Sequence, residues 1–175
     1  YTSSSAVYGI NKNLNNTHED NFNRELYASF KLATEKLVSN YADKKNINYY
    51  LMRLFNTYGD DNDKFSFVEK IIRAKKNNSK INLINDGLSL RDFIHLDDVG
   101  KVYKTFTSQS LKKGVYDIGT GKGFLIKDLF AIARVPQKKI IKINKIEEIQ
   151  NSIADTKKLF EQVGNFKFKN LNQYI

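Results

Sequence analysis

The sequence predicts an α/β fold with a largely parallel sheet. Apolar residues recur along the chain with two spacings, every second residue and every third or fourth residue, as they do in strands and helices. Strand-like and helix-like segments alternate, which is typical of βαβ units. The 175 residues are also enough to bury a substantial core.

The first quarter of the chain predicts a strand at its start and then a helix. Over about residues 24–42 apolar side chains recur at three or four, which predicts one buried helix face. The residues expected on that face are Leu26, Phe30, Ala33, Leu37 and Tyr41. The near-continuous apolar run 47–55, interrupted by Arg53, then predicts a buried strand.

The remaining elements are shorter. A helix is expected over 64–76, and its inward residues are Phe65, Val68, Ile71 and Ile72. Residues 81–84 alternate like a strand, and Asn-Asp-Gly at 85–87 is a turn signal. The elements expected after this turn are strands at 92–94, 115–118 and 140–143, helices at 97–107, 125–134 and 156–163, and a short final helix.

Composition excludes several classes of protein. No apolar run approaches the roughly 20 residues of a membrane span, and the absence of cysteine excludes disulfides and thiolate metal sites, so we expect a cytoplasmic protein without membrane contact. The net charge is +10, but the 24 lysines and 5 arginines are scattered. We therefore expect no nucleic-acid partner, and the positive field favours an anionic small molecule. A non-catalytic basic binding module remains the alternative from another class.

Residues 119–123, Gly-Thr-Gly-Lys-Gly, follow a predicted strand and precede a predicted helix, as phosphate-binding loops do. Phe124 stands where the dinucleotide fingerprint needs its third glycine, and Tyr116 stands where the Walker A pattern needs a glycine. We therefore expect a plain strand-to-helix turn.

Tyr27 and Lys31 are the first candidates for chemistry. Four residues apart on a helix, their side chains share a face, and an ammonium near a tyrosine oxygen stabilises the phenolate. The spacing also occurs at Tyr8 with Lys12 and at Tyr41 with Lys45. Only Tyr27 lies early on a strong helix, away from its apolar stripe, after a strand that ends in a cluster of hydroxyls. Sites in α/β proteins form at such strand ends.

Five segments in order resemble the extended short-chain dehydrogenases/reductases, in particular NAD-dependent nucleotide-sugar epimerases and dehydratases of the UDP-glucose 4-epimerase type. They are residues 2–9 (Thr-Ser-Ser-Ser-Ala-Val-Tyr-Gly), 27–31 (Tyr-Ala-Ser-Phe-Lys), 53–59 (Arg-Leu-Phe-Asn-Thr-Tyr-Gly), 91–99 (Arg-Asp-Phe-Ile-His-Leu-Asp-Asp-Val) and 116–121 (Tyr-Asp-Ile-Gly-Thr-Gly). The resemblance implies the second half of an NAD(P)-binding Rossmann fold together with a small α/β substrate-binding lobe.

The resemblance also implies a catalytic set of Ser4, Tyr27 and Lys31. Tyr27, as phenolate, would take a proton from a sugar hydroxyl while hydride passes to the nicotinamide. Lys31 would stabilise the phenolate and hold the cofactor, and Ser4 would bind the reacting oxygen. Ser3, Tyr27, Lys31 and Leu54 are the implied contacts to NAD or NADP.

The implied substrate is a nucleotide-diphosphate sugar, bound by Ser4, Asn56, Arg91 and Lys145. In dehydratases of this kind an acidic residue usually follows the catalytic hydroxyl, whereas here Ser-Ala stands at 5–6, which favours an epimerase. A keto-sugar reductase or a dehydratase remains the alternative. A homodimer through the tyrosine helix is the implied assembly.

Plainer roles stay open for several of these residues. Asn56 could form a turn, and Arg91 could pair with Asp86 or Asp92. His95 is expected to be structural and His18 a loop residue, so no metal site is expected. We expect residues 1–58 to belong to the Rossmann domain and 59–175 to the substrate lobe, with about 91–118 returning to the Rossmann sheet. Because the chain opens inside a buried strand, we also expect a Gly-rich half to precede it in the complete protein.

Overall fold

The computed structural model describes residues 1–9, 26–77, 79–144, 148–164 and 166–175. It confirms the α/β class. Strands β1 (Thr2–Ser4), β2 (Tyr50–Leu54) and β6 (Gly114–Ile118) form a parallel sheet in the order β1-β2-β6. No helix in the described part of the chain is both long and apolar enough to cross a membrane.

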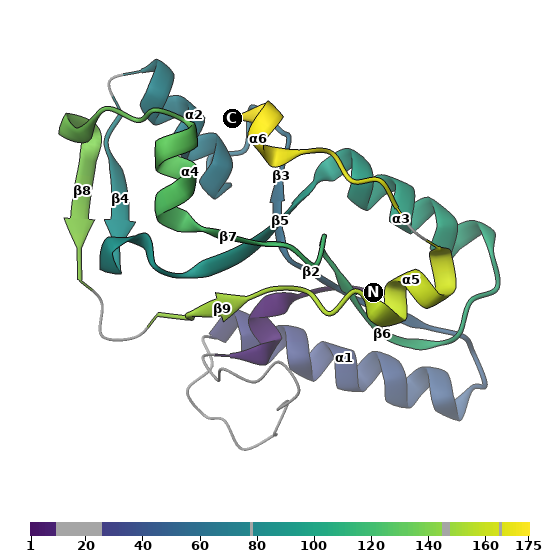
Figure 1. Ribbon diagram of the computed structural model, residues 1–175. Helices are drawn as coiled ribbons and strands as arrows, with labels where there is room; N and C mark the ends of the chain where they lie inside the picture. Colours follow the sequence, from purple (N-terminus) through teal and green to yellow (C-terminus); the bar gives the residue numbers. More distant parts are fainter. Residues whose placement is uncertain (10–25, 78, 145–147, 165) are drawn as a thin grey trace.

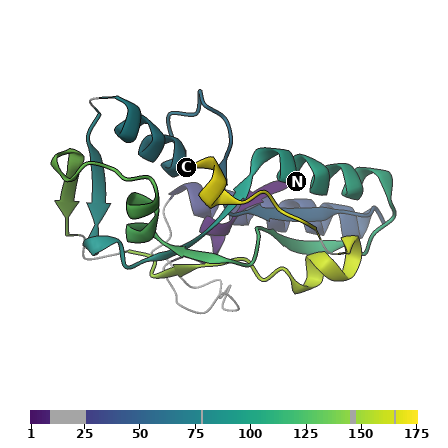
Figure 2. The ribbon, with the colours of Figure 1, turned by 45° about the horizontal axis from the view of Figure 1, so that its top comes forward.

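Helices cover both faces of this sheet (Figures 1 and 2). Helix α1 (Leu26–Lys44) lies on one side, and α3 (Leu96–Ser108) and α5 (Lys157–Val163) pack on the other. Successive residues of a strand point to opposite faces, so Met52 joins the core beneath α3 while Arg53 points to α1. This alternation brings a charged side chain under α1.

A second group of strands carries the other half of the molecule. Strands β3 (Asn56–Tyr58) and β9 (Asn151–Ser152) pair in parallel with β5 (Leu90–His95), and β7 (Gly123–Leu125) pairs with it antiparallel. Strands β4 (Ile81–Ile84) and β8 (Ile140–Ile143) form a separate parallel pair. The sequence predicted β4, β8 and the turn after β4, but it did not predict β3, β7 or β9, which have only two or three residues each.

Helices α2 (Phe67–Lys76), α4 (Ile126–Ile132) and α6 (Leu171–Tyr174) complete this half around a common core. Val68 and Ile71 of α2 are fully buried in it, as predicted. Phe65 is not, because it lies before the helix begins and is 88% exposed. The predicted strand 47–55 is also shorter than expected, since Ile47 is exposed and only Tyr50–Leu54 pair with neighbours.

The predicted inner face of α1 is wrong. Leu26, Phe30, Leu37 and Tyr41 are between 63 and 73% exposed, whereas Ala28, Glu35 and Ala42 are buried. Small alanine side chains let the helix lie close to the sheet, and Glu35 meets Arg53 there. The apolar stripe therefore faces outward, and Tyr41 is not the packing residue that the sequence suggested.

Candidate functional site

The carboxyl ends of β1, β2 and β6 bring the first predicted site residues together. The strand register places Ser4 beside Leu54 and Leu54 beside Ile118, so the three strands end level with one another. Asn56 follows two residues after Leu54 and begins β3. In α/β proteins this edge of the sheet is where ligands bind.

Lys31 joins α1 to this edge. Its Nζ donates a hydrogen bond to the Thr2 carbonyl oxygen on β1 at 2.9 Å, and it lies 5.7 Å from the centre of the Tyr27 ring. Tyr27 itself is 55% exposed. The structure therefore brings Tyr27 and Lys31 together at the strand that leads into Ser4.

The two serines of β1 have different surroundings. The Ser4 Oγ accepts a hydrogen bond from the Ala6 amide at 3.2 Å, which caps the short 3-10 turn Ser5–Tyr8. The Ser3 side chain is buried, and its Oγ has no hydrogen-bond partner among the described residues. Ser4 can still donate its own hydroxyl hydrogen, because its oxygen acts as acceptor in the turn.

A buried polar network holds this region in place. Arg53 donates to both oxygens of Glu35, and its guanidinium lies 4.7 Å from the centre of the Tyr8 ring. The Tyr8 hydroxyl donates to Asp117 on β6 at 2.6 Å, and the Asp155 amide donates to the other oxygen of that carboxylate. Burial, together with the carboxylate of Asp117, raises the pKa of the Tyr8 hydroxyl, so it stays protonated as a donor.

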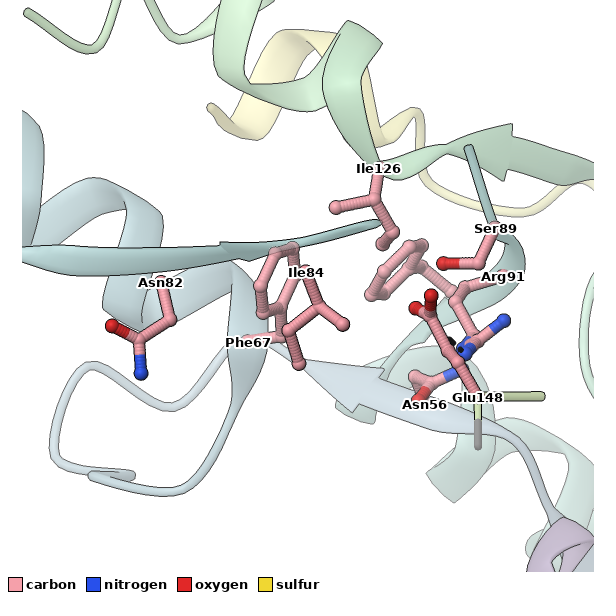
Figure 3. Close-up of a pocket in the computed structure, with 9 residues that line it drawn as sticks. Asn56, Phe67, Asn82, Ile84, Ser89, Arg91, Ile126 and Glu148 are labelled. Carbon is pink, nitrogen blue, oxygen red and sulfur yellow. Dashed lines mark ion pairs between the residues drawn. The ribbon is translucent and has the colours of Figure 1, made fainter. Parts of the chain in front are cut away.

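A cavity of about 210 Å³ lies between β3, β4 and β5 (Figure 3). Among its lining residues, Asn56 and Arg91 were predicted to bind substrate. Apolar side chains form most of the remaining wall, and Ser89 and Glu148 add polar groups. The other lining residues are Phe67, Asn82, Ile84, Phe93 and Ile126. The predicted catalytic residues Ser4, Tyr27 and Lys31 do not line this cavity; they group at β1 and α1.

Polar contacts fix the side chains of Asn56 and Arg91, the two residues predicted to bind substrate. The Asn56 Nδ2 donates to the Asp92 carbonyl oxygen at 2.9 Å, so Asn56 ties β3 to β5. Arg91 pairs with Glu148 at 3.7 Å, and not with Asp86 or Asp92. Asp86 instead pairs with the exposed Lys142. Burial lowers the pKa of the Arg91 guanidinium, and Glu148 acts in the opposite direction.

Asp92 explains why the glycine-rich segment 119–123 is a plain turn. Its fully buried carboxylate accepts hydrogen bonds from the Thr120 amide, the Thr120 hydroxyl and the Gly121 amide, and from the Ala154 amide of a later segment. The amides that a phosphate loop would offer to a ligand are thus already used. The turn joins two strands and not, as expected, a strand and a helix, because Gly123 already begins β7 and α4 follows only after that strand.

The structure also defines what the sequence missed. Glu148, Ser89 and Phe67 line the cavity, and nothing in their spacing indicated this, because they come from three segments far apart in the chain. His95 is buried and its Nδ1 accepts the Asp97 amide hydrogen at the start of α3. Lys145, His18 and Lys12 lie outside the described residues. Within the described part, no group of three or more acidic or histidine side chains could hold a metal ion.

The family described as "NAD dependent epimerase/dehydratase family" matches residues 1–119. The chain belongs to this family. The resemblance of the five motifs is thereby confirmed, and it extends over more than half of the chain.

Several known proteins are moderately similar to this chain. CDP-abequose synthase of Salmonella muenchen is 31% identical over 113 residues, which cover 60% of this chain and 38% of the relative. UDP-N-acetylglucosamine 4-epimerase from Methanobrevibacter ruminantium M1, solved with UDP-N-acetylmuramic acid, is 27% identical with a TM-score of 0.75, over 97% of this chain and 56% of its own. MoeE5, solved with UDP-glucose and NAD, is 25% identical with a TM-score of 0.80, and the match covers 98% of this chain and 60% of MoeE5.

These likenesses confirm a Rossmann-type α/β fold for the chain. They also show that the matched region spans about two fifths to three fifths of the length of these proteins. The relatives that the chain matches include both a putative UDP-glucose 4-epimerase from Methanocaldococcus jannaschii and a dTDP-D-glucose 4,6-dehydratase from Homo sapiens, so membership of the family does not by itself fix the reaction.

Proposed function

We propose that the protein carrying this chain is an NAD-dependent nucleotide-sugar epimerase. The observation that supports it most is the cavity in which Arg91 and Asn56 meet an apolar wall. A guanidinium binds phosphate oxygens with paired hydrogen bonds, and apolar and aromatic side chains suit a nucleoside. The chemistry of the cavity wall therefore suits the diphosphate and the nucleoside of a nucleotide sugar.

The residues at β1 fit a nicotinamide cofactor. Ser3 holds a buried hydroxyl without a partner among the described residues, and Tyr27 and Lys31 add a hydroxyl and an ammonium next to the same strand. We assign Ser3, Tyr27, Lys31 and Leu54 to hold NAD or NADP. When bound, the cofactor accepts a hydride from the sugar carbon and returns it.

Three side chains handle the proton in this proposal. Tyr27 accepts it from the sugar hydroxyl as that carbon is oxidised and returns it on reduction. Lys31, fixed by its hydrogen bond to the Thr2 carbonyl oxygen, places a positive charge beside the Tyr27 ring. Ser4 donates its hydroxyl hydrogen to the reacting oxygen, since the Ala6 amide occupies only an acceptor position of its Oγ.

The residues after Ser4 favour epimerisation over dehydration. Loss of water needs an acid or base at a second sugar carbon, and Ser5 and Ala6, which begin the 3-10 turn, carry none. The ketone formed at that carbon can then be reduced on its other face, which completes an epimerisation, or it can leave the site. A keto-sugar reductase, which starts from such a ketone, would use the same residues.

We also propose a homodimer through α1, supported by its exposed stripe of Leu26, Phe30, Leu37 and Tyr41. The division into a Rossmann part, 1–58 with a return near 91–118, and a substrate lobe is supported by β6 pairing with β2. A cytoplasmic location is supported by the lack of cysteine.

To test the proposal, the protein that carries this chain is incubated with NAD and a sugar nucleotide, either UDP-glucose or UDP-N-acetylglucosamine. The configuration of the sugar is then followed by NMR. Inversion at C4 supports the proposal, and Tyr27→Phe should slow it by about 10²- to 10⁴-fold. Tyr41→Phe, on the same helix with a similarly exposed ring, should leave the rate unchanged. A 4-keto-6-deoxy product would identify a dehydratase instead. Lack of turnover together with salt-sensitive DNA binding would favour a non-catalytic basic module.

A further inference from the structure

Ser89 is buried with an unused hydroxyl. Only 1% of the residue is exposed, and its Oγ has no hydrogen-bond partner among the described residues. Its main-chain oxygen is satisfied, since the Ile126 amide donates to it at 3.1 Å. A buried hydroxyl without a partner costs stability, so a group that completes its hydrogen bond stabilises the protein when it binds.

The hydroxyl belongs to the cavity wall. Ser89 lines the cavity together with Arg91, and in Figure 3 its oxygen points in among the lining side chains on the side of Arg91 and Glu148. Ser89 and Arg91 are two residues apart on an extended segment, so their side chains leave the same face about 6–7 Å from each other. One ligand can reach both.

The order of the strands indicates which end of that ligand lies at Ser89. Asn56 pairs with Phe93 on β5 and lies just beyond Leu54, next to the strand ends that carry Ser4. The chain enters β5 just after Ser89 and runs through Arg91 to Phe93, so Ser89 lies on the far side of Arg91 from the catalytic edge. A sugar that reaches Ser4 leaves the nucleoside on the Ser89 side, where Ile84, Phe67 and Ile126 supply an apolar wall.

We propose that the Ser89 hydroxyl hydrogen-bonds the nucleoside of a nucleoside diphosphate whose phosphates Arg91 binds. This inference rests on the proposed function for the direction of the ligand. It makes Ser89 a specificity-determining residue, because the hydroxyl distinguishes a nucleoside diphosphate from a bare diphosphate.

The test compares Ser89→Ala with wild type by calorimetric titration of the protein with UDP, CDP and inorganic pyrophosphate. We expect UDP or CDP to bind about 3- to 30-fold more weakly to the variant, while pyrophosphate binds equally well. The melting temperature of the unliganded variant should be unchanged or higher, because removing the Ser89 hydroxyl breaks no hydrogen bond within the described residues.

Ser66→Ala is the matched control. The Ser66 hydroxyl is also buried, but it donates to the Thr57 carbonyl oxygen at 3.1 Å and lies outside the cavity. This variant should melt at a lower temperature and bind UDP as wild type does.

Three results would overturn the inference. Unchanged nucleotide affinity in Ser89→Ala would show that the hydroxyl does not contact the ligand. An equal loss for nucleotide and pyrophosphate would show that Ser89 acts only through Arg91. A wild-type protein that binds neither nucleotide would overturn the proposed function itself, and this inference with it.

Discussion

The Arg53 guanidinium donates two hydrogen bonds to the Glu35 carboxylate, at 2.9 and 2.7 Å between nitrogen and oxygen. Both side chains are more than nine-tenths buried, and the pair joins β2 to α1, the helix that carries Tyr27 and Lys31. The interaction therefore fixes the helix over the sheet at the point where two predicted catalytic side chains are presented.

We expect Glu35→Ala to lower the free energy of unfolding by about 3–5 kcal/mol, because it leaves the Arg53 charge buried and unpaired. Urea denaturation measures the change. Asp43→Ala breaks the exposed pair of Asp43 with Lys113, at 2.7 Å, and should cost less than about 1 kcal/mol. Equal losses in the two variants would contradict a special role for the buried pair.

The buried Asp92 carboxylate should also contribute strongly to stability. It accepts hydrogen bonds from the Thr120 amide and hydroxyl and from the Gly121 and Ala154 amides. Asp92→Asn places an NH₂ group against these donors and removes the charge, so we expect a loss of about 2–4 kcal/mol in denaturant unfolding. Thr120→Val leaves the Asp92 carboxylate in place and removes the two hydrogen bonds of the Thr120 hydroxyl, one to Asp92 and one from the exposed Lys122 amide, so it should cost about 1–2 kcal/mol. A milder effect for Asp92→Asn than for Thr120→Val would rule out this account.

Asp117 makes stability depend on pH. Burial raises the pKa of its carboxyl above the ordinary 3.8, while the hydrogen bonds from Tyr8 and the Asp155 amide act in the opposite direction. Since the folded pKa is the higher one, the folded protein holds the proton more tightly than the unfolded chain. This contribution to stability is complete below about pH 3.8 and declines as the pH rises through the folded pKa.

Asp117→Asn does not titrate, so its free energy of unfolding should rise relative to wild type as the pH increases from about 3 to 7. Tyr8→Phe removes a hydrogen bond that lowers the pKa of Asp117, and it should make the pH dependence steeper. Urea unfolding at several pH values measures both. A constant difference between Asp117→Asn and wild type across this range would contradict the assignment.

Glu148 should weaken anion binding by Arg91 at the proposed substrate site. Its carboxylate lies 3.7 Å from the Arg91 guanidinium and is itself largely buried, so it competes with an incoming phosphate for that charge. Glu148→Gln should therefore bind inorganic pyrophosphate about 3- to 10-fold more tightly in calorimetric titration. Asp86→Asn, whose carboxylate is exposed, paired with Lys142 and absent from the cavity wall, is the control and should leave this affinity unchanged.

The outward stripe of α1 predicts association of two copies. In an isologous dimer each substitution is repeated on the partner, so Leu37→Lys places two charges in the interface. Analytical ultracentrifugation should find wild-type dimers at micromolar concentration and monomers of this variant. Phe65→Lys replaces a side chain that is 88% exposed and lies off α1, and it should stay dimeric. Monomeric wild-type protein would refute the dimer.

Some features followed from the sequence alone. The alternation of spacings predicted the α/β class and most longer elements, since periodicity depends only on local backbone geometry. The motifs predicted the family and named Asn56 and Arg91, which the structure brings into one cavity. The replacement of the third glycine by Phe124 correctly indicated a turn after residue 118 and not a phosphate loop, and Asp92 supplies the reason, although the turn leads into β7 and not directly into a helix.

Tertiary structure decided the rest. Periodicity finds a helix stripe but not what covers it, and α1 buries Ala28 and Glu35 because Arg53 points to it from β2. Strands β3, β7 and β9 have two or three residues each and are held by pairing with β5, so the local sequence carried no signal for them. Glu148 and Ser89 likewise became site residues only when folding brought distant segments together around Arg91. Local spacing encodes the elements, whereas the partners of buried charges and hydroxyls depend on contacts across the whole chain.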